Sequence, residues 1–256
     1  WKKVGTLSNK IFGSFSLCIS SSKDTSDYLN ILGAKNIKFF GNIKFCSVVE
    51  NQKEEDEQFK SIANKKIWCA VSTHSNEEDL CGKAHSIAKK SQGDILTIII
   101  PRHIHRINSI YSNLRDLGFK VQIKKEKDPI NSSADIVLVN YYGAVTKYLK
   151  YFKQIFIGKS MLKKFENSGG QNPIDAAKMG CHIYHGPYVY NFREIYQFLD
   201  ESKLSEEIKN PENLANKLIK NFETDLKTDN EKIKKLNVYS NKIFDNVINE
   251  YNTFIK

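Results

Sequence analysis

The stretch DILTIII (Asp94–Ile100) and the earlier stretch KIWCAV (Lys66–Val71) are short, unbroken apolar runs. Each is long enough for a β-strand and too short for a membrane span. Between them lies an amphipathic segment, Asn76–Lys90, whose glutamate-rich start suits the positive end of a helix. Continuous apolar strands are typical of a parallel sheet covered on both faces. These runs therefore predict a doubly wound α/β domain.

The same alternation of strand and helix continues to about residue 184. Its further strands are predicted at 119–123, 135–139, 154–157 and 181–184, and its further helices at 104–117, 144–151 and 172–179. Ahead of this region, a helix at 24–32 and a strand at 37–40 form a smaller α/β piece. Residues 50–63 are charged and polar, which predicts either a linker or a surface helix. After Asp200 only helical patterns are visible.

Composition limits the classes of function. The net charge is +10, but lysine is spread along the whole chain and only four arginines occur, so nucleic-acid binding is not favoured. Compositional drift, with some attraction to an anionic membrane surface, explains the charge better. Five scattered cysteines without metal-ligand spacing indicate reduced thiols in the cytosol. Because the chain opens on Trp1 and not on Met, we expect a processed or truncated piece, or an incomplete reading frame. The sequence shows no signal peptide.

Two polar loops follow the first two predicted strands, at the edge where α/β sheets bind ligands. Ser72, Thr73 and His74 follow the first strand, where they either contact a ligand or merely precede a capped helix with an acidic first turn. Pro101 and Arg102 follow the second strand, where a guanidinium either clamps a phosphate or lies in solvent. The histidines nearby have no third ligand in sequence, so we expect no metal and no cofactor.

Two glycine-containing loops come later in the chain. Gly169 and Gly170 precede Asn172–Asp175, where Pro173 suits the first turn of a helix and backbone N–H groups favour an anion. The other interpretation is an ordinary turn, since the P-loop and dinucleotide-binding patterns are both absent. Residues 186–192 (GPYVYNF) either cap the next helix or close over a ligand. Four such loops after strands of one sheet indicate a ligand-binding site more specifically than any single loop does.

Taken in order, the segments STH…EE, PRHxxR, FIGxS…GGQNPID and GPxxxNF resemble the 3-deoxy-D-manno-octulosonic acid (Kdo) transferases. The resemblance runs from about Ala70 to Phe192, and more weakly through Leu32–Ala34 and Gly41–Phe45. It implies the C-terminal, Rossmann-like half of a GT-B glycosyltransferase. On this basis we expect a remnant of the acceptor-binding domain at 1–50, the nucleotide-sugar-binding domain at 51–225 and a helical tail at 226–256.

The resemblance also implies the chemistry. The donor is CMP-Kdo and the acceptor is a lipid A precursor at the cytoplasmic face of the inner membrane, in lipopolysaccharide synthesis. Residues that match the family's CMP-binding motifs, or line the same cleft, are Ser72, Thr73, His74, Pro101, Arg102, Tyr141, Tyr142, Gly143, Gly169, Gly170, Asn172, Pro173, Ile174 and Asp175. The family's general base belongs to the N-terminal half, so no catalytic residue is assigned here and the fragment alone is expected to be inactive.

This chain departs from the family at three positions: Ala144 replaces a glutamate, Asp175 replaces a longer glutamate, and Gln171 replaces a common histidine. Loss of the glutamate at 144 removes a ligand contact, so weaker CMP binding is expected. Two other functions remain open. One is a non-catalytic module that binds nucleotide sugars, and the other is a GT-B enzyme that uses a UDP-sugar.

Overall fold

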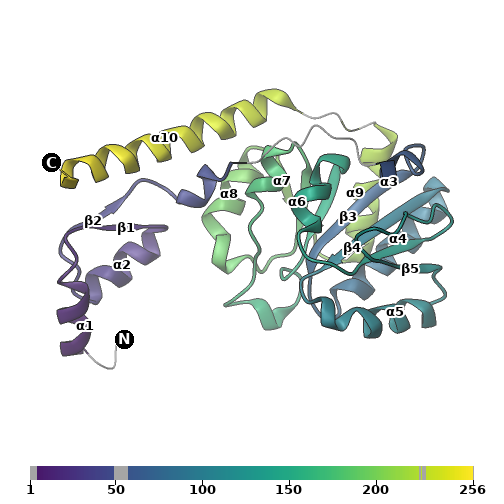
Figure 1. Cartoon of the computed structure of the whole chain (residues 1–256), viewed down its shortest axis with the longest axis horizontal. Helices are drawn as coiled ribbons and strands as arrows, with labels where there is room; N and C mark the ends of the chain where they lie inside the picture. Colours follow the sequence, from purple (N-terminus) through teal and green to yellow (C-terminus); the bar gives the residue numbers. More distant parts are fainter. Residues whose placement is uncertain (1–4, 49–56, 225, 227–228, 256) are drawn as a thin grey trace. The chain divides into compact units, whose positions relative to one another are not determined.

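The structure, a computed structural model, describes residues 5–48, 57–224, 226 and 229–255 (Figure 1). The chain divides into two compact units. One is Val49–Ile233, and the other combines Trp1–Val48 with Lys234–Lys256. The predicted division into a remnant, a nucleotide-sugar-binding domain and a tail stays a prediction. Of the stretch 50–63, predicted as either a linker or a surface helix, residues 50–56 lie outside the described residues, whereas 57–60 form the short helix α3 (Glu57–Lys60).

The larger unit is built on a seven-stranded sheet in the order β5-β6-β4-β3-β7-β8-β9, and every pairing in it is parallel. The strands are β3 (Lys66–Thr73), β4 (Ile95–Pro101), β5 (Val121–Lys124), β6 (Ile136–Val139), β7 (Gln154–Ile157), β8 (His182–His185) and β9 (Ser205–Glu207). Strand order reverses between β3 and β7, so this is the topological switch point where α/β sheets bind ligands.

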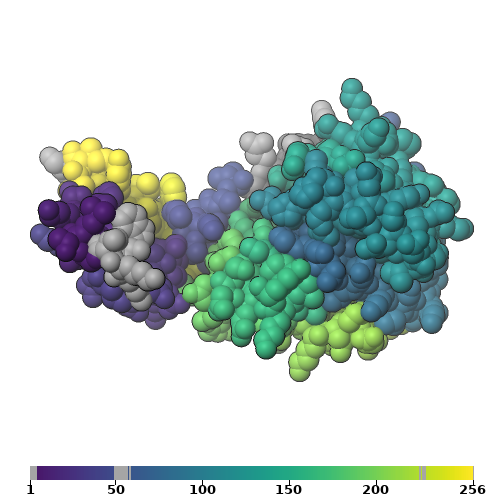
Figure 2. Space-filling model, turned by 90° about the horizontal axis from the view of Figure 1, so that it is seen from below, coloured from purple at the N-terminus to yellow at the C-terminus, as the bar shows by residue number. Residues whose placement is uncertain are grey.

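Every residue of β4, β6 and β7 is buried, as continuous apolar runs predict for strands covered on both faces. The covering helices are α4 (Glu77–Gln92), α5 (Ile107–Asp116), α6 (Ala144–Tyr148), α7 (Ile174–Lys178), α8 (Arg193–Glu201) and α9 (Pro211–Glu223). One core cluster joins Trp68 and Ile99 of the sheet to Ala84, Leu114 and Leu218 of the helices. In Figure 2 the segments from β3 to β6 (blue to teal) lie beside those from α6 to α8 (green).

The smaller unit contains α1 (Gly5–Phe12), β1 (Cys18–Ser20), α2 (Lys23–Ile31) and β2 (Ile37–Phe39). Its two strands pair in parallel. The long helix α10 (Asn230–Ile255) packs on the turn after β2, where a Cβ on Gly41 would lie 2.7 Å from the Ile243 side chain. The Ser240 hydroxyl donates to the carbonyl of Phe45 at 2.6 Å. The weaker part of the family resemblance thus forms the surface on which α10 rests.

The predicted strands and helices from residue 66 to residue 184 are confirmed, with ends that differ by at most three residues. The expectation of only helices after Asp200 is wrong, because β9 adds a strand at the sheet edge. Its sequence, SEE, lacks an apolar run, since an edge strand forms ladder bonds on one side only and needs little burial. Among the described residues, no helix combines the length and apolarity needed to cross a bilayer.

Candidate functional site at the carboxyl edge of the sheet

The predicted loops gather at one edge of the sheet because all its strands run the same way. The loops after β3, β4, β6, β7 and β8 all begin at their carboxyl ends. The backbone joins the first two directly, since the Arg102 amide donates to the Thr73 carbonyl at 3.0 Å. The same edge holds the switch point, so these loops surround the crevice where a ligand is expected.

Glu77 holds the two sides of the switch point together. Its side chain is completely buried at the start of α4. One carboxylate oxygen accepts from the backbone amides of His74 (2.9 Å) and Lys159 (2.7 Å). The other accepts from the amides of Ser160 (2.9 Å) and Met161 (3.1 Å). Three successive backbone N–H groups of the loop after β7 therefore already donate to a carboxylate of the chain itself.

The loop after β7 in turn organises the later loops. Gly170 donates its amide to the Lys159 carbonyl at 2.8 Å, and Tyr188 donates to the Ser160 carbonyl at 2.9 Å. The Gly186 amide donates to the Ser160 hydroxyl at 2.9 Å. A Cβ on Gly158 would lie 2.6 Å from the Thr73 Cα, so only glycine allows this approach to the β3 loop. Glu77 and this loop therefore connect the loops after β3, β7 and β8, three of the five around the crevice.

Helix capping differs from the prediction. Asn76 occupies the N-cap of α4, but its side chain does not cap and its φ is 77°, in the left-handed region. The Glu77 amide bonds instead to the His74 carbonyl at 2.9 Å. The acidic first turn is present, but the carboxylates of Glu77 and Glu78 form tertiary contacts instead of capping the helix. Glu78, which is 3% exposed, accepts from the Thr73 hydroxyl at 2.9 Å and from both terminal nitrogens of Arg106.

The two arginines of the PRHxxR segment therefore have different environments. Arg106 forms a two-pronged ion pair with Glu78, with its nearer nitrogen at 2.9 Å. Arg102 is exposed, and in the described part of the chain its guanidinium contacts no carboxylate. It directly follows Pro101, the last residue of β4. Arg102 is therefore the arginine that is available to an anion at this edge.

His74 lies beside the same crevice and is half-buried. Its ring packs edge-on against His103 and Phe165, with centroids 5.3 Å apart in both pairs. Burial lowers the pKa of the His74 imidazole, and the charges of His103 and Lys159 lower it further, against the hydrogen bond to the Ser72 carbonyl. Since that carbonyl can only accept, His74 Nδ1 carries the proton. Its Nε2 is then an acceptor, suited to a ligand hydroxyl rather than a phosphate.

The turn after β6 is the most exposed part of the predicted site. The Tyr142 ring is 76% exposed, whereas the Tyr141 hydroxyl donates to that of Tyr148. Gly143 has φ 83° and precedes α6, whose first residue, Ala144, is buried. Where the family has a glutamate, this position therefore presents only a small buried side chain.

The glycine turn before α7 is explained first by the chain's own packing. A Cβ on Gly169 would lie 2.0 Å from the Tyr188 carbonyl oxygen, so glycine is required there without any ligand. Asn172 accepts from the Ile174 amide at 3.2 Å, and Pro173 takes the N-cap position. The helix that follows spans only five residues, shorter than the predicted 172–179. Its dipole field is correspondingly weaker than a full-length helix would supply.

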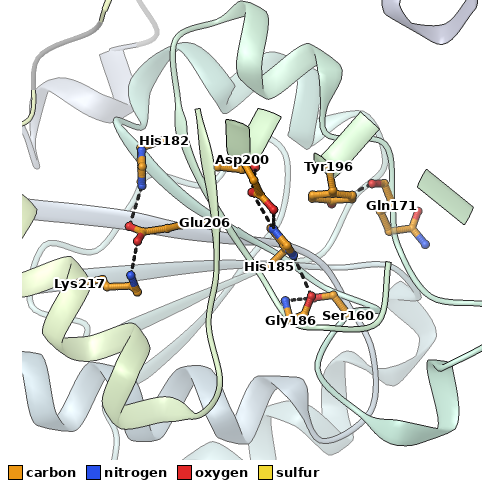
Figure 3. A network of polar contacts seen from close by, with 10 residues as sticks. Ser160, Gln171, His182, His185, Gly186, Tyr196, Asp200, Glu206 and Lys217 are labelled. Atoms are coloured by element: carbon orange, nitrogen blue, oxygen red, sulfur yellow. Dashed lines mark hydrogen bonds and ion pairs between the residues drawn. The ribbon is translucent and has the colours of Figure 1, made fainter. Parts of the chain in front are cut away.

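Sequence reasoning missed several side chains that brace this edge (Figure 3). His185, at the end of β8, bonds through Nε2 to Asp200 of α8 at 3.1 Å. The Tyr196 hydroxyl donates to the Gln171 carbonyl at 3.0 Å, which ties α8 to the glycine turn. Apart from Gln171, which belongs to the GGQNPID segment, none of these residues stands in a recognisable motif. The only sequence signal is a polar residue at the end of a buried strand.

A second polar group in Figure 3 links the edge strand β9 to its neighbours. Glu206 accepts from His182 at 2.9 Å and is also ion-paired with Lys217. Burial alone would raise the pKa of Glu206, but the hydrogen bonds from His182 and Lys217 lower it to about 2. This group supports the sheet rather than the crevice.

Comparison of folds defines the class. The C-terminal CMP-Kdo binding domain of WaaA from Acinetobacter baumannii superimposes with a TM-score of 0.60 at 16% identity, covering 73% of this chain and 94% of that one. Anabaena Alr3699/HepE, solved with UDP and glucose, gives a TM-score of 0.57 at 10% identity over 99% of this chain and 68% of that one. The larger unit has the Rossmann-like fold of a GT-B glycosyltransferase domain.

Sequence comparison narrows the class to one kind of relative. The chain is 30% identical over 220 residues to the 3-deoxy-D-manno-octulosonic acid transferase of Rickettsia bellii, and 27% identical over 215 residues to that of Aquifex aeolicus. The aligned parts cover 85% and 84% of this chain, but only 51% and 56% of those proteins. No protein-family model matches the chain. The resemblance to Kdo transferases is confirmed, and the chain spans about half the length of these relatives.

Proposed function

We propose that the chain is the donor-binding part of a Kdo transferase, which binds CMP-Kdo in the crevice between β3 and β7. The observation that carries the proposal is the exposed guanidinium of Arg102 at the end of β4, beside that crevice and within a sequence similar to Kdo transferases. A guanidinium in this position suits the phosphate that joins CMP to the sugar. Arg102 would hold that phosphate while the bond to the sugar breaks and negative charge grows on it.

The remaining predicted residues surround this contact. His74 Nε2 would accept from a sugar or ribose hydroxyl, and Asn172–Asp175 would lie against the nucleoside. The acceptor, by this proposal, is a lipid A precursor at the cytoplasmic face of the inner membrane, in lipopolysaccharide synthesis. Proton removal from the acceptor requires a general base, which we assign to a part of the protein outside this chain.

Calorimetric titration with CMP, CDP and UDP tests the donor assignment. We expect CMP to bind more tightly than UDP, and Arg102→Ala to weaken CMP binding by about tenfold or more, which corresponds to about 1.4 kcal/mol. Arg115→Ala is the matched control, because Arg115 is an exposed arginine on α5 outside the crevice. Equal or tighter binding of UDP would favour a UDP-sugar enzyme, for which the fold shared with HepE is the supporting observation. Unchanged CMP affinity in Arg102→Ala would remove this residue from the site.

A further inference from the structure

A cavity of about 580 Å³ opens at the amino edge of the sheet, opposite the loops described above. Its lining includes the first residue of β3, Lys66, and the first residue of β7, Gln154. The turn before β3 and the end of α9 complete it, so the cavity lies entirely within the larger unit. This volume is in the range of pockets that bind small molecules, roughly 300–1,000 Å³.

One wall of the cavity is aromatic. The rings of Phe59 and Tyr151 stack 3.9 Å apart at an interplanar angle of 6°. Phe59 is fixed from behind by edge-on contacts with Tyr148 and Phe152, and it is only 6% exposed. Phe222 of α9 also lines the cavity. These rings are anchored by the core, so they offer a preformed surface to a flat apolar group.

The charged side chains that line the described part of the cavity are all lysines. Among the described residues of its lining there are four lysines (Lys60, Lys65, Lys66 and Lys153) and no carboxylate. Lys60 and Lys65 are ion-paired with Glu57 and Asp94, two carboxylates that lie outside the lining. Lys66 is half-buried, and its ammonium donates to the neutral amide oxygen of Gln92 at 2.5 Å. A positive charge next to apolar walls, held by a neutral partner, favours an anion there.

We propose that this cavity binds a small aromatic anion, whose ring lies against Phe59, Tyr151 and Phe222 and whose acidic group faces Lys66. The acidic group is a carboxylate, sulfonate or phosphate, since each accepts charge-assisted hydrogen bonds from an ammonium. The site is separate from the donor crevice, because parallel strands place their amino and carboxyl ends on opposite edges of the sheet. A ligand here therefore binds together with the donor rather than in its place.

Fluorescence titration with anilinonaphthalene sulfonate tests the proposal, because this dye is an aromatic anion that brightens in apolar pockets. We expect one dye per chain in the folded protein. Lys66→Met should weaken binding about five- to tenfold, and Ala63→Trp should abolish it by filling the cavity from its exposed rim. Lys90→Met, which removes an exposed lysine of α4 outside the lining, should leave binding unchanged.

The uncharged dye phenylnaphthylamine separates the two parts of the site. It should bind more weakly than the sulfonate and respond to Ala63→Trp but not to Lys66→Met. Circular dichroism confirms that each variant is folded before its affinity is compared. No dye binding, equal binding in Lys66→Met and Lys90→Met, or displacement of the dye by CMP would each overturn the proposal.

Discussion

Replacing Glu77 with glutamine tests whether one carboxylate organises the donor crevice. The carboxylate accepts four backbone hydrogen bonds, two at each oxygen. Glutamine has nearly the same shape but accepts at only one oxygen, and its amide nitrogen donates. In Glu77→Gln, two backbone amides that were satisfied therefore face a donor inside a fully buried site.

The magnitude follows from these contacts. Each buried donor that loses its acceptor costs about 1–3 kcal/mol, so two of them cost about 2–6 kcal/mol. The free energy of unfolding of such a domain is about 5–15 kcal/mol in total. The variant should therefore remain folded, but with a much smaller free energy of unfolding. Because the Lys159 and Ser160 backbone also holds Gly170 and Tyr188, the loss should loosen the crevice as well as the global fold.

Denaturant unfolding and CMP titration measure the two effects. We expect a lower midpoint with an unchanged m-value, together with weaker CMP binding in protein that is still folded. Asp79→Asn is the matched control, because it removes the same charge from the same helical turn, where Asp79 forms no hydrogen bond or ion pair within the described chain. If Glu77→Gln loses less than about 0.5 kcal/mol, or no more than Asp79→Asn, the carboxylate does not hold the loops.

Two further predictions concern pH and packing. His85 is completely buried and bonds through Nδ1 to the Thr97 hydroxyl, and burial lowers the pKa of its imidazole to about 4. The unfolded chain then binds the proton more readily than the folded chain. The free energy of unfolding should therefore be at its full value above about pH 6.5 and fall by roughly 3 kcal/mol towards pH 4. Urea unfolding at several pH values should show a smaller fall of this free energy in His85→Leu. Gly169→Ala places a Cβ 2.0 Å from the Tyr188 carbonyl oxygen, so thermal unfolding should show destabilisation, whereas Gly5→Ala, with no atom within 4 Å, should not. An unchanged melting temperature in Gly169→Ala would show that the turn adapts.

The fold was predictable because its signals are local. Strands such as Ile136–Val139 are buried along their whole length, which leaves an unbroken apolar run in the sequence. Strand β9 was not predicted, because this edge strand has only three residues, all polar, and contains no apolar run. In the smaller unit the sequence predicts only a helix and one strand. The partner strand β1 (Cys18–Ser20) is too short to show the alternation of a strand, so its pairing with β2 could not be predicted.

The site was predictable as a set of loops but not as a network of contacts. Arg102 was identified from its place after a buried strand, and it is exposed there. For Glu77 the sequence predicts only a place in the acidic first turn of a helix, because an acidic residue there suits the dipole whatever else it touches. Its actual partners, the amides of Lys159 to Met161, are more than eighty positions away along the chain. Contacts that depend on strand order cannot be seen before the topology is known.

The bonded amides of the β7 loop also bear on where the phosphate of the proposed donor would bind. In many nucleotide-binding α/β folds, phosphate rests on the N-terminus of the helix after the first strand of the sheet. Here that helix, α4, begins with Glu77, Glu78 and Asp79, and the neighbouring amides of the β7 loop are already bonded to Glu77. A phosphate placed there would meet the carboxylates of the first turn, and the amides of the β7 loop already donate to one of them. Under the proposed function, phosphate binding at this edge would therefore rely on a side chain rather than on these amides, and the exposed Arg102 after β4 would supply it.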